Sequence, residues 1–284
     1  MNVTPPEPPY GVIGLGLVGG SLARALARSL PEARLVVVDP DPAARAAALR
    51  DRLTKDALDA PGQQLAECNL IFVCTPMAEL PQLLPQLQRY LRPETVLADV
   101  LPVKAPVERL VAELLPEARW VGCDPLVGGR DPGGWSRARP DLFVGRPVAL
   151  CPRQGREALA AGVGTVWAAL GARPVVLPAE DHDRLVAATS QAPWLSALAI
   201  ARVVAASPGA ERLVGRGLED ALRLACFAPE EFVAAIATNP FAPAVARVVA
   251  DELRRLADLA ETDVAGFEAA AAEGREARLR LLPE

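Results

Sequence analysis

The sequence lacks the usual features of a disulfide-bonded, zinc-binding or membrane-spanning protein. Its five cysteines form no C-x-x-C pair, their number is odd, and most of them lie in apolar runs. This pattern favours buried thiols in a reducing compartment over disulfides or a zinc site. No stretch of about twenty residues is apolar and also free of charge and proline, so no membrane span is indicated.

Blocks of basic residues are also missing. The formal net charge of the 284-residue chain is −5, and its lysines and arginines are scattered. Nucleic acid is therefore not expected as the main partner. Residues 1–9 contain no basic region followed by an apolar one. We interpret them as a flexible proline-rich leader rather than a signal peptide, and we expect a cytoplasmic protein.

The strongest positive signal is a glycine-rich loop near the N-terminus. Gly14, Gly16 and Gly19 follow a short apolar run with G-x-G-x-x-G spacing, and a segment with helical periodicity comes next. The first glycine allows a tight turn, the second has no Cβ to block a pyrophosphate, and the third lets helix and strand pack closely. The free N–H groups of the helix would then meet the phosphate charge. The residues between the glycines complete this predicted cofactor loop: Leu15, Leu17 and Val18.

An acidic residue follows the second apolar run. Residues 35–38 form that run and end at Asp39, twenty residues after Gly19. An acid at this place accepts hydrogen bonds from a ribose 2′-OH and would repel a 2′-phosphate. The segment predicts a site for NAD, with NADP less favoured. The alternative is a glycine-rich turn in another kind of α/β protein.

Alternating strand and helix patterns extend to about residue 178. A run such as 69–74 is apolar throughout, which is typical of a buried parallel strand. In a doubly wound sheet the ligand lies beyond the carboxyl ends of the strands. We therefore expect Thr75, Pro76 and Asp99 to lie beside the cofactor.

Strand signals stop after residue 178, and long helical patterns follow. We predict an α/β fold with a Rossmann-type doubly wound domain over residues 10–178 and an all-helical domain over 179–284. The helical part is expected to be a bundle that contributes to substrate binding and whose apolar surplus suits a homodimer interface. The stretch 128–141 is rich in Gly, Pro and Arg and is predicted to be a loop that reaches over the cleft.

The motifs, taken in order, resemble those of the prephenate and arogenate dehydrogenases of tyrosine biosynthesis. The resemblance covers about residues 11–256 and rests on Gly-Leu-Gly-Leu-Val-Gly-Gly-Ser-Leu-Ala, Phe-Val-Cys-Thr-Pro, His182-Asp183 and Gly217-Leu-Glu-Asp-Ala-Leu-Arg223. It implies an NAD(P)-dependent oxidative decarboxylation of a small carboxylate substrate. The cofactor takes hydride from the ring carbon that carries the hydroxyl, and CO2 is lost as the ring becomes aromatic.

The resemblance breaks where the chemistry is expected. The family's His-Pro-Met-Ala-Gly begins here with Asp124, and Pro102 replaces the serine of Asp-Val-Gly-Ser-Val-Lys. Ser-His-Leu-Pro-His becomes Ser190-Gln-Ala-Pro-Trp194. Asp124 therefore stands at the position of the catalytic histidine, and the chain contains a single histidine, His182.

Three interpretations of these substitutions stay open. Asp124 can serve as the acceptor of the hydroxyl proton, because a carboxylate in a partly apolar cleft can act as a base. Its charge would repel a dicarboxylate such as prephenate, whereas the side chain of arogenate, with its added amine, would be tolerated better. Alternatively the chain is a dehydrogenase of a different small substrate, or a dinucleotide-binding homologue without catalysis.

Other residues have two interpretations each. The resemblance implies that Arg223 clamps a substrate carboxylate, although it can also be a surface arginine. Lys104 can meet a substrate carboxylate or pair with an acid. Gln191 can bind a substrate oxygen or pair locally, and Asp99 can instead hold its loop through backbone N–H groups. For His182, which has acids on both sides, we expect a solvated helix-capping role.

Overall fold

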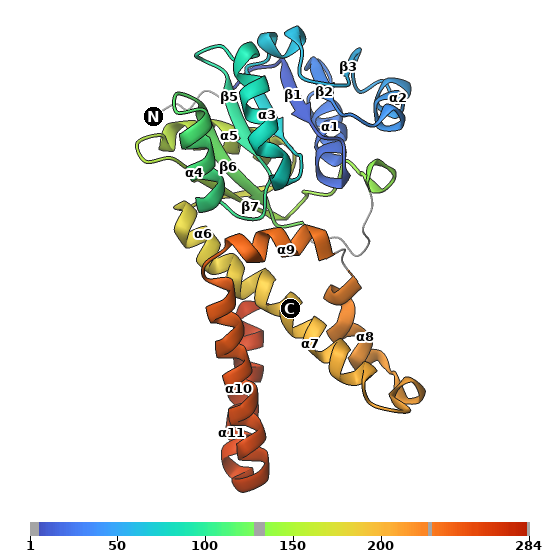
Figure 1. Ribbon diagram of the computed structural model, residues 1–284, viewed down its shortest axis with the longest axis vertical. Coiled ribbons are helices and arrows are strands. Elements are labelled where there is room, and N and C mark those ends of the chain that lie inside the picture. Colours follow the sequence, from blue (N-terminus) through green and yellow to red (C-terminus); the bar gives the residue numbers. More distant parts are fainter. Residues whose placement is uncertain (1–5, 128–133, 227–228, 283–284) are drawn as a thin grey trace.

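The computed structural model describes residues 6–127, 134–226 and 229–282. One sheet has the order β3-β2-β1-β4-β5-β6-β7-β8, and all neighbours are parallel except β6 and β7 (Figure 1). The strands are β1 (Tyr10–Ile13), β2 (Leu35–Val38), β3 (Asp56–Leu58), β4 (Leu70–Val73), β5 (Val96–Asp99), β6 (Arg119–Pro125), β7 (Pro147–Pro152) and β8 (Arg173–Val176).

The register of the sheet gathers the carboxyl ends of the central strands at one edge. Ile13 pairs with Val38 on one side and with Val73 on the other, and Val73 pairs with Asp99. The strand order thus extends from β1 to both sides, with β2 and β3 on one side and β4 to β8 on the other. The crevice between β1 and β4 is therefore the topological switch point where doubly wound sheets bind ligands. The predicted Rossmann-type fold is confirmed.

Both faces of the sheet are covered, which explains why its central strands are apolar throughout. On one face Trp167 of α5 meets Phe72 and Phe143 edge-on, with ring centroids 5.6 and 5.1 Å away. On the other face Leu84 and Val111 pack from helices into a second buried cluster. The helices of this half are α1 (Leu17–Ser29), α2 (Pro42–Arg50), α3 (Leu80–Leu87), α4 (Ala105–Leu114) and α5 (Glu157–Ala169).

Only helices follow β8 in the described part of the chain, as predicted, and they are arranged as open arms. α7 and α8 form one arm and α10 and α11 form another, while α9 lies across the region below the sheet (Figure 1). Within the described ranges no single helix is long and apolar enough to cross a membrane. The helices are α6 (Ala179–Val186), α7 (Ala192–Ala205), α8 (Arg216–Leu222), α9 (Pro229–Thr238), α10 (Ala242–Thr262) and α11 (Val264–Leu281).

The stretch that was predicted to reach over the cleft is described only from residue 134 onward, since 128–133 lie outside the described residues. Its described part packs on α1. The guanidinium of Arg24 lies 4.4 Å from the centre of the Trp135 ring, and Ser21 Oγ accepts the N–H of Arg139 at 3.0 Å. These contacts attach the loop to the helix that begins at the glycine-rich turn.

Candidate functional site

The glycine-rich turn has the geometry that a dinucleotide requires. Gly14 has a φ of +89°, and a Cβ there would lie 2.7 Å from the carbonyl oxygen of Cys74. At Gly19 a Cβ would lie 1.9 Å from the carbonyl oxygen of Gly14, whereas at Gly16 it would meet nothing within 4 Å. The first and last glycines are thus needed by the protein itself, and the space at the middle one is open for a ligand.

The beginning of α1 adds an electrostatic reason for anion binding. Gly16 caps the helix without a side-chain hydrogen bond, and the first turn contains no acidic residue. Its free N–H groups can therefore bind a phosphate. Thr75, which follows β4, has a buried hydroxyl without a partner, and the neighbouring Pro76 is exposed. An orphaned hydroxyl at a strand's carboxyl end fits a site that a cofactor completes.

Asp39 lies beside the glycine loop. Its Oδ2 accepts the N–H of Leu15 at 2.5 Å, and its Oδ1 accepts the N–H of Asp41 at 2.8 Å. The half-buried carboxylate therefore joins the end of β2 to the turn after β1. In Rossmann-type folds, an acid at this place accepts hydrogen bonds from the hydroxyls of the adenosine ribose.

Asp99 and Lys104 form a buried ion pair next to the carboxyl end of β5. Lys104 Nζ donates to Asp99 Oδ1 and, at 2.5 Å, to the carbonyl oxygen of Cys123, and both side chains are almost completely buried. Asp99 also accepts the N–H of Leu101 at 2.9 Å. Of the alternatives that the sequence left open, the structure shows pairing with an acid for Lys104 and support of the loop for Asp99.

His182 does not have the solvated position that the sequence suggested. It is 1% exposed, its Nε2 lies 3.1 Å from Asp124 Oδ2, and its Nδ1 lies 2.9 Å from Asp183 Oδ1. Asp124 is 7% exposed and lies near the end of β6. The chain's single histidine therefore contacts the acid that replaces the family's histidine. Sequence reasoning missed this contact.

Asp183 holds this histidine to the rest of the site. Its two oxygens accept the N–H groups of Lys104 at 2.7 Å and Ala105 at 2.9 Å, at the beginning of α4. The side chain of Asn239 donates to the carbonyl of Asp183 at 2.8 Å and to Gln191 Oε1 at 2.9 Å. Local pairing is thus the role that the structure shows for Gln191, whose Nε2 is buried without a partner.

The charges in this cluster perturb one another. Burial alone lowers the pKa of His182, but hydrogen bonds to Asp124 and Asp183 outweigh burial and raise it. Burial also lowers the pKa of Lys104, and the carboxylates of Asp99 and Asp124 reverse this effect, so that the pKa is raised. Both cationic forms are therefore favoured by acids that surround them.

Arg223 and Trp194 lie in the helical half. Arg223 is exposed, and within the described part of the chain no hydrogen bond or ion pair joins it to Asp124 or His182. Trp194 is 4% exposed and stacks on Phe232 with ring centroids 5.0 Å apart. Trp194 thus has a packing role in the structure, and substrate binding by Arg223 stays a prediction.

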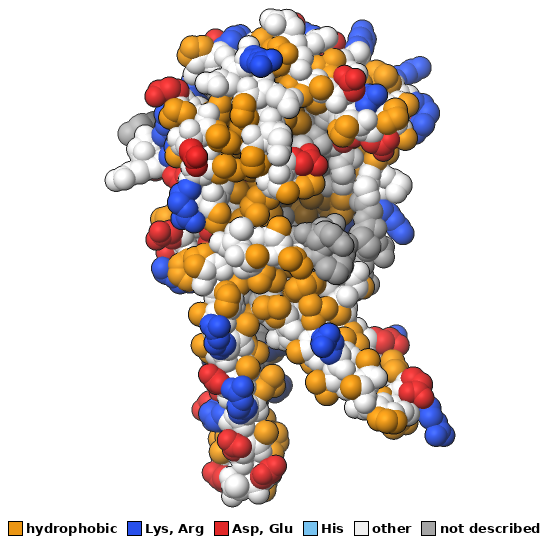
Figure 2. Space-filling model, in the orientation of Figure 1, with side chains coloured by type: hydrophobic (Ala, Val, Ile, Leu, Met, Phe, Trp, Pro, Cys, Tyr) orange, Lys and Arg blue, Asp and Glu red, His pale blue; other side chains and the backbone are white. Residues whose placement is uncertain are grey.

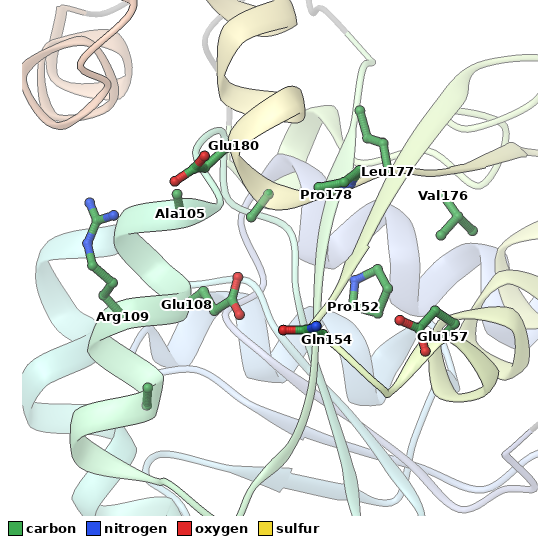
Figure 3. Close-up of a pocket in the computed structure, with 12 residues that line it drawn as sticks. Ala105, Glu108, Arg109, Pro152, Gln154, Glu157, Val176, Leu177, Pro178 and Glu180 are labelled. Atoms are coloured by element: carbon green, nitrogen blue, oxygen red, sulfur yellow. The ribbon is translucent and has the colours of Figure 1, made fainter.

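A pocket of about 770 Å³ is lined by residues of α4, the end of β7 and the beginning of α6. Glu108 of α4 faces Gln154 and Pro152 across it, and Glu180 lies at the beginning of α6 (Figure 3). Neither Asp124 nor the glycine loop lines this pocket. We therefore assign the candidate active site to the switch point and the Asp124 cluster. Among the described residues no group of three or more His, Cys, Asp or Glu is placed to hold a metal ion.

Known proteins resemble this chain in sequence and in fold. The model of the family "Prephenate dehydrogenase, nucleotide-binding domain" matches residues 22–176. A cyclohexadienyl dehydrogenase of Zymomonas mobilis is 30% identical over 191 residues, which are 66% of this chain and 64% of that protein. A 4-amino-4-deoxyprephenate dehydrogenase of Streptomyces pristinaespiralis is 30% identical over 261 residues, 87% of this chain and 83% of that protein. The chain spans 55% to 64% of the length of three curated relatives.

Solved structures agree with the sequence relatives. A prephenate dehydrogenase from A. aeolicus, in complex with hydroxyphenyl propionate and NAD+, superimposes with a TM-score of 0.87 over 96% of this chain and 98% of that chain, at 20% identity. For the arogenate dehydrogenase of Synechocystis the TM-score is 0.81 at 25% identity, over 96% of this chain and 99% of that chain. The similarity thus includes the helical half as well as the sheet. The chain belongs to the prephenate dehydrogenase family.

Proposed function

We propose that the chain is an NAD-dependent dehydrogenase that oxidatively decarboxylates prephenate or arogenate in tyrosine biosynthesis. The observation that carries this proposal is the position of Asp124. A buried carboxylate, paired with an imidazole, lies at the same edge of the sheet as the glycine loop. Family membership supports the reaction type, since a relative named cyclohexadienyl dehydrogenase matches this chain in sequence and an arogenate dehydrogenase has the same fold.

The proposed roles follow from the contacts. The glycine loop and the beginning of α1 hold the pyrophosphate, and Asp39 holds the adenosine ribose. Bound NAD+ supplies a hydride acceptor. Asp124 accepts the proton of the ring hydroxyl as the hydride leaves the same carbon, and returns it to the ring oxygen when CO2 departs. The proton is therefore neither consumed nor released overall, and a base at this place lowers the barrier by stabilising the developing charge.

The acidic residue favours a second candidate substrate, in which an amine replaces the ring hydroxyl. A carboxylate accepts hydrogen bonds from an amine and pairs with its protonated form, and such charge-assisted bonds are stronger than neutral ones. The relative from Streptomyces pristinaespiralis, which the chain matches over 83% of that protein's length, has a 4-amino-4-deoxyprephenate dehydrogenase name. Asp124 thus fits a ring amine as well as a ring hydroxyl.

One assay separates these candidates. NADH formation is followed at 340 nm with prephenate, arogenate or 4-amino-4-deoxyprephenate, each with NAD+ and with NADP+. We expect turnover with NAD+ and with prephenate or arogenate. Turnover with the amino compound alone would move the assignment to the second candidate. Tight NAD+ binding without turnover of any of the three would contradict the proposal and favour a different substrate or a non-catalytic role.

We further propose that the helical arms pair two copies of this chain. Large apolar side chains are exposed along both arms, among them Val203 at 68% and Val248 at 66%. Figure 2 shows hydrophobic side chains gathered where the arms diverge below the sheet. A second copy with the same arms offers a self-complementary surface, as a twofold interface requires.

A further inference from the structure

The hydrogen bonds of Asp183 determine which ring nitrogen of His182 carries a proton. The carboxylate of Asp183 accepts the backbone N–H groups of Lys104 and Ala105, at 2.7 and 2.9 Å. Two donated amide protons stabilise its ionised form, which can only accept hydrogen bonds. His182 Nδ1, 2.9 Å from Asp183 Oδ1, is therefore the donor in that contact. In the neutral ring Nε2 is then left with a lone pair.

The other ring nitrogen faces a second carboxylate. Nε2 of His182 lies 3.1 Å from Asp124 Oδ2, and both side chains are buried. A lone pair on Nε2 that faced an ionised carboxylate at this distance would be repelled. A proton must therefore lie between the two atoms, either on the imidazole or on the carboxyl group. In both cases the Asp124–His182 pair is electrically neutral, which a lone Asp124 carboxylate is not.

We propose that Asp124 and His182 form one acid–base unit, in which His182 is the positioning residue that cancels the charge of Asp124 and orients its carboxylate toward the substrate. This proposal rests on the proposed function. The resemblance places a histidine at the position where this chain has Asp124. Here a neutral carboxylate–imidazole pair occupies that place, with the imidazole contributed by α6 and the carboxylate by β6.

The neutral pair removes the difficulty that a lone carboxylate creates for a dicarboxylate substrate. An ionised Asp124 without a counterion would add its negative charge to those of the substrate's carboxylates, beside the substrate ring. With the proton in place, its charge is balanced by His182, and the charge of Asp99 is balanced by Lys104. Asp183 is the third acid of the cluster, and its carboxylate accepts hydrogen bonds from two amide N–H groups and from the imidazole. Prephenate and arogenate are then both compatible with the site.

The groups that face His182 come from several elements, and each of them raises or lowers the pKa of the imidazole. Asp124 of β6 and Asp183 of α6 favour the imidazolium, whereas burial and the charge of Lys104, which precedes α4, oppose it. The net result is a raised pKa of His182. Removal of the Asp124 carboxylate deletes one of the two hydrogen bonds that favour the imidazolium. The pKa of His182 should therefore fall.

The single histidine allows a direct test that does not depend on activity. In protein prepared without a histidine tag, a long-range ¹H–¹⁵N spectrum contains the ring signals of His182 alone. We expect a proton on Nδ1 at all pH values and a titration midpoint above 6.5 in the wild type. In Asp124→Asn the midpoint should shift downward. A midpoint at or below 6.5 in the wild type, or no shift in the variant, would overturn the proposal.

Two substitutions of His182 separate positioning from packing in the kinetics. The amide nitrogen of Asn can replace Nδ1 and keep the contact with Asp183, whereas that of Gln can replace Nε2 and keep a donor for Asp124. For His182→Asn we expect a folded protein of lower thermal stability, a higher KM for prephenate and an acid limb of kcat/KM that moves to higher pH. His182→Gln should show a smaller change in KM and in the pH profile, because it restores the hydrogen bond without the charge.

The results of these experiments distinguish a failure of the inference from a failure of the proposed function. If His182→Asn keeps both the wild-type pH profile and KM, the histidine only packs and the inference is wrong, while the proposed function stands. If the wild type turns over none of the substrates, the proposed function fails. The inference is then decided by the ring titration alone, which reports whether Asp124 and His182 share a proton.

Discussion

At the scale of single residues, the behaviour of Asp124 depends on neighbours that are distant in sequence. His182 is 58 positions away from Asp124, and Lys104 is 79 positions away from Asp183. Local pattern could show that an acid replaces a histidine, because the flanking residues match the family motif. It could not show that the remaining histidine turns inward, since three neighbouring acids suggested a solvated helix end. The packing of α6 against β7 and α4 brings the pair together.

The pH dependence of stability follows from the raised pKa of His182. A group whose pKa is higher in the folded than in the unfolded state adds stability below its unfolded pKa. That stability is lost as the pH rises through the folded pKa. We expect the difference in unfolding free energy between wild type and His182→Asn to decrease as the pH rises above 6.5. Urea titrations at several pH values measure it, and a difference independent of pH would contradict this assignment.

Lys104 should matter for stability more than for substrate binding. It is 2% exposed and paired with Asp99, so Lys104→Met leaves a buried carboxylate without its partner. Breaking such a pair costs about 3 kcal/mol or more of unfolding free energy. Lys55→Met, at the exposed lysine, is the matched control and should change stability little. Equal stability of the two variants, measured by urea unfolding, would show that the buried pair is not needed.

Asp39 should determine the choice of dinucleotide. Asp39→Ala removes the acceptor for a ribose hydroxyl and the charge that repels a 2′-phosphate. We expect weaker NAD+ binding and a smaller preference over NADP+, measured by calorimetry. Asp41→Ala is the control, because Asp41 caps α2 through the N–H of Ala43 and should affect stability only. Unchanged affinities of Asp39→Ala for both cofactors would refute this role.

At the scale of secondary-structure elements, two glycines of one loop should respond oppositely to the same substitution. In Gly16→Ala the new Cβ meets no protein atom within 4 Å, so stability should change by less than about 1 kcal/mol while NAD+ binding is lost. In Gly19→Ala the Cβ would clash with the carbonyl oxygen of Gly14, and the fold itself should be destabilised. Thermal unfolding and NAD+ titration measure both effects, and NAD+ binding by Gly16→Ala would contradict the assignment.

Elements with a strong local signal could be predicted, and those without one could not. β1, β2, β4 and β5 are short apolar runs, and buried parallel strands need little else. β3, the sequence Asp-Ala-Leu at residues 56–58, has no such run and forms only because the edge of β2 is available. The helical pattern that follows residue 178 is interrupted, between α6 and α7, by a single turn of π-helix over Ala187–Gln191. That turn ends at the buried Gln191, whose side chain meets Asn239.

At the scale of the whole molecule, the open arms define the test for the dimer. Val203→Glu and Val248→Glu place a charge on one arm each, where the apolar side chains are exposed. We expect the double variant to sediment as a monomer and the wild type as a dimer. Leu49→Glu, on α2 and 46% exposed in the wild type, should leave the dimer intact. A monomeric wild type at micromolar concentration would contradict the proposed pairing.

The division into a sheet and a helical half could be predicted from the sequence, because strand patterns stop after residue 178. The open shape of the helical half could not. Apolar periodicity shows that a helix has a face to bury, but it does not show whether that face meets the same chain or another. The exposed valines of both arms lie on such apolar helix faces.

In the proposed reaction, Asp124 acts as the base of an NAD-dependent oxidative decarboxylation. The most direct test is the kcat for NADH formation by Asp124→Asn, beside the wild type, with NAD+ affinity measured on the same samples. The amide has nearly the shape of the carboxylate but does not accept a proton. We expect kcat to fall by about 100-fold or more while NAD+ binds as tightly as before. A variant that keeps the wild-type kcat would contradict the role of Asp124 as the base.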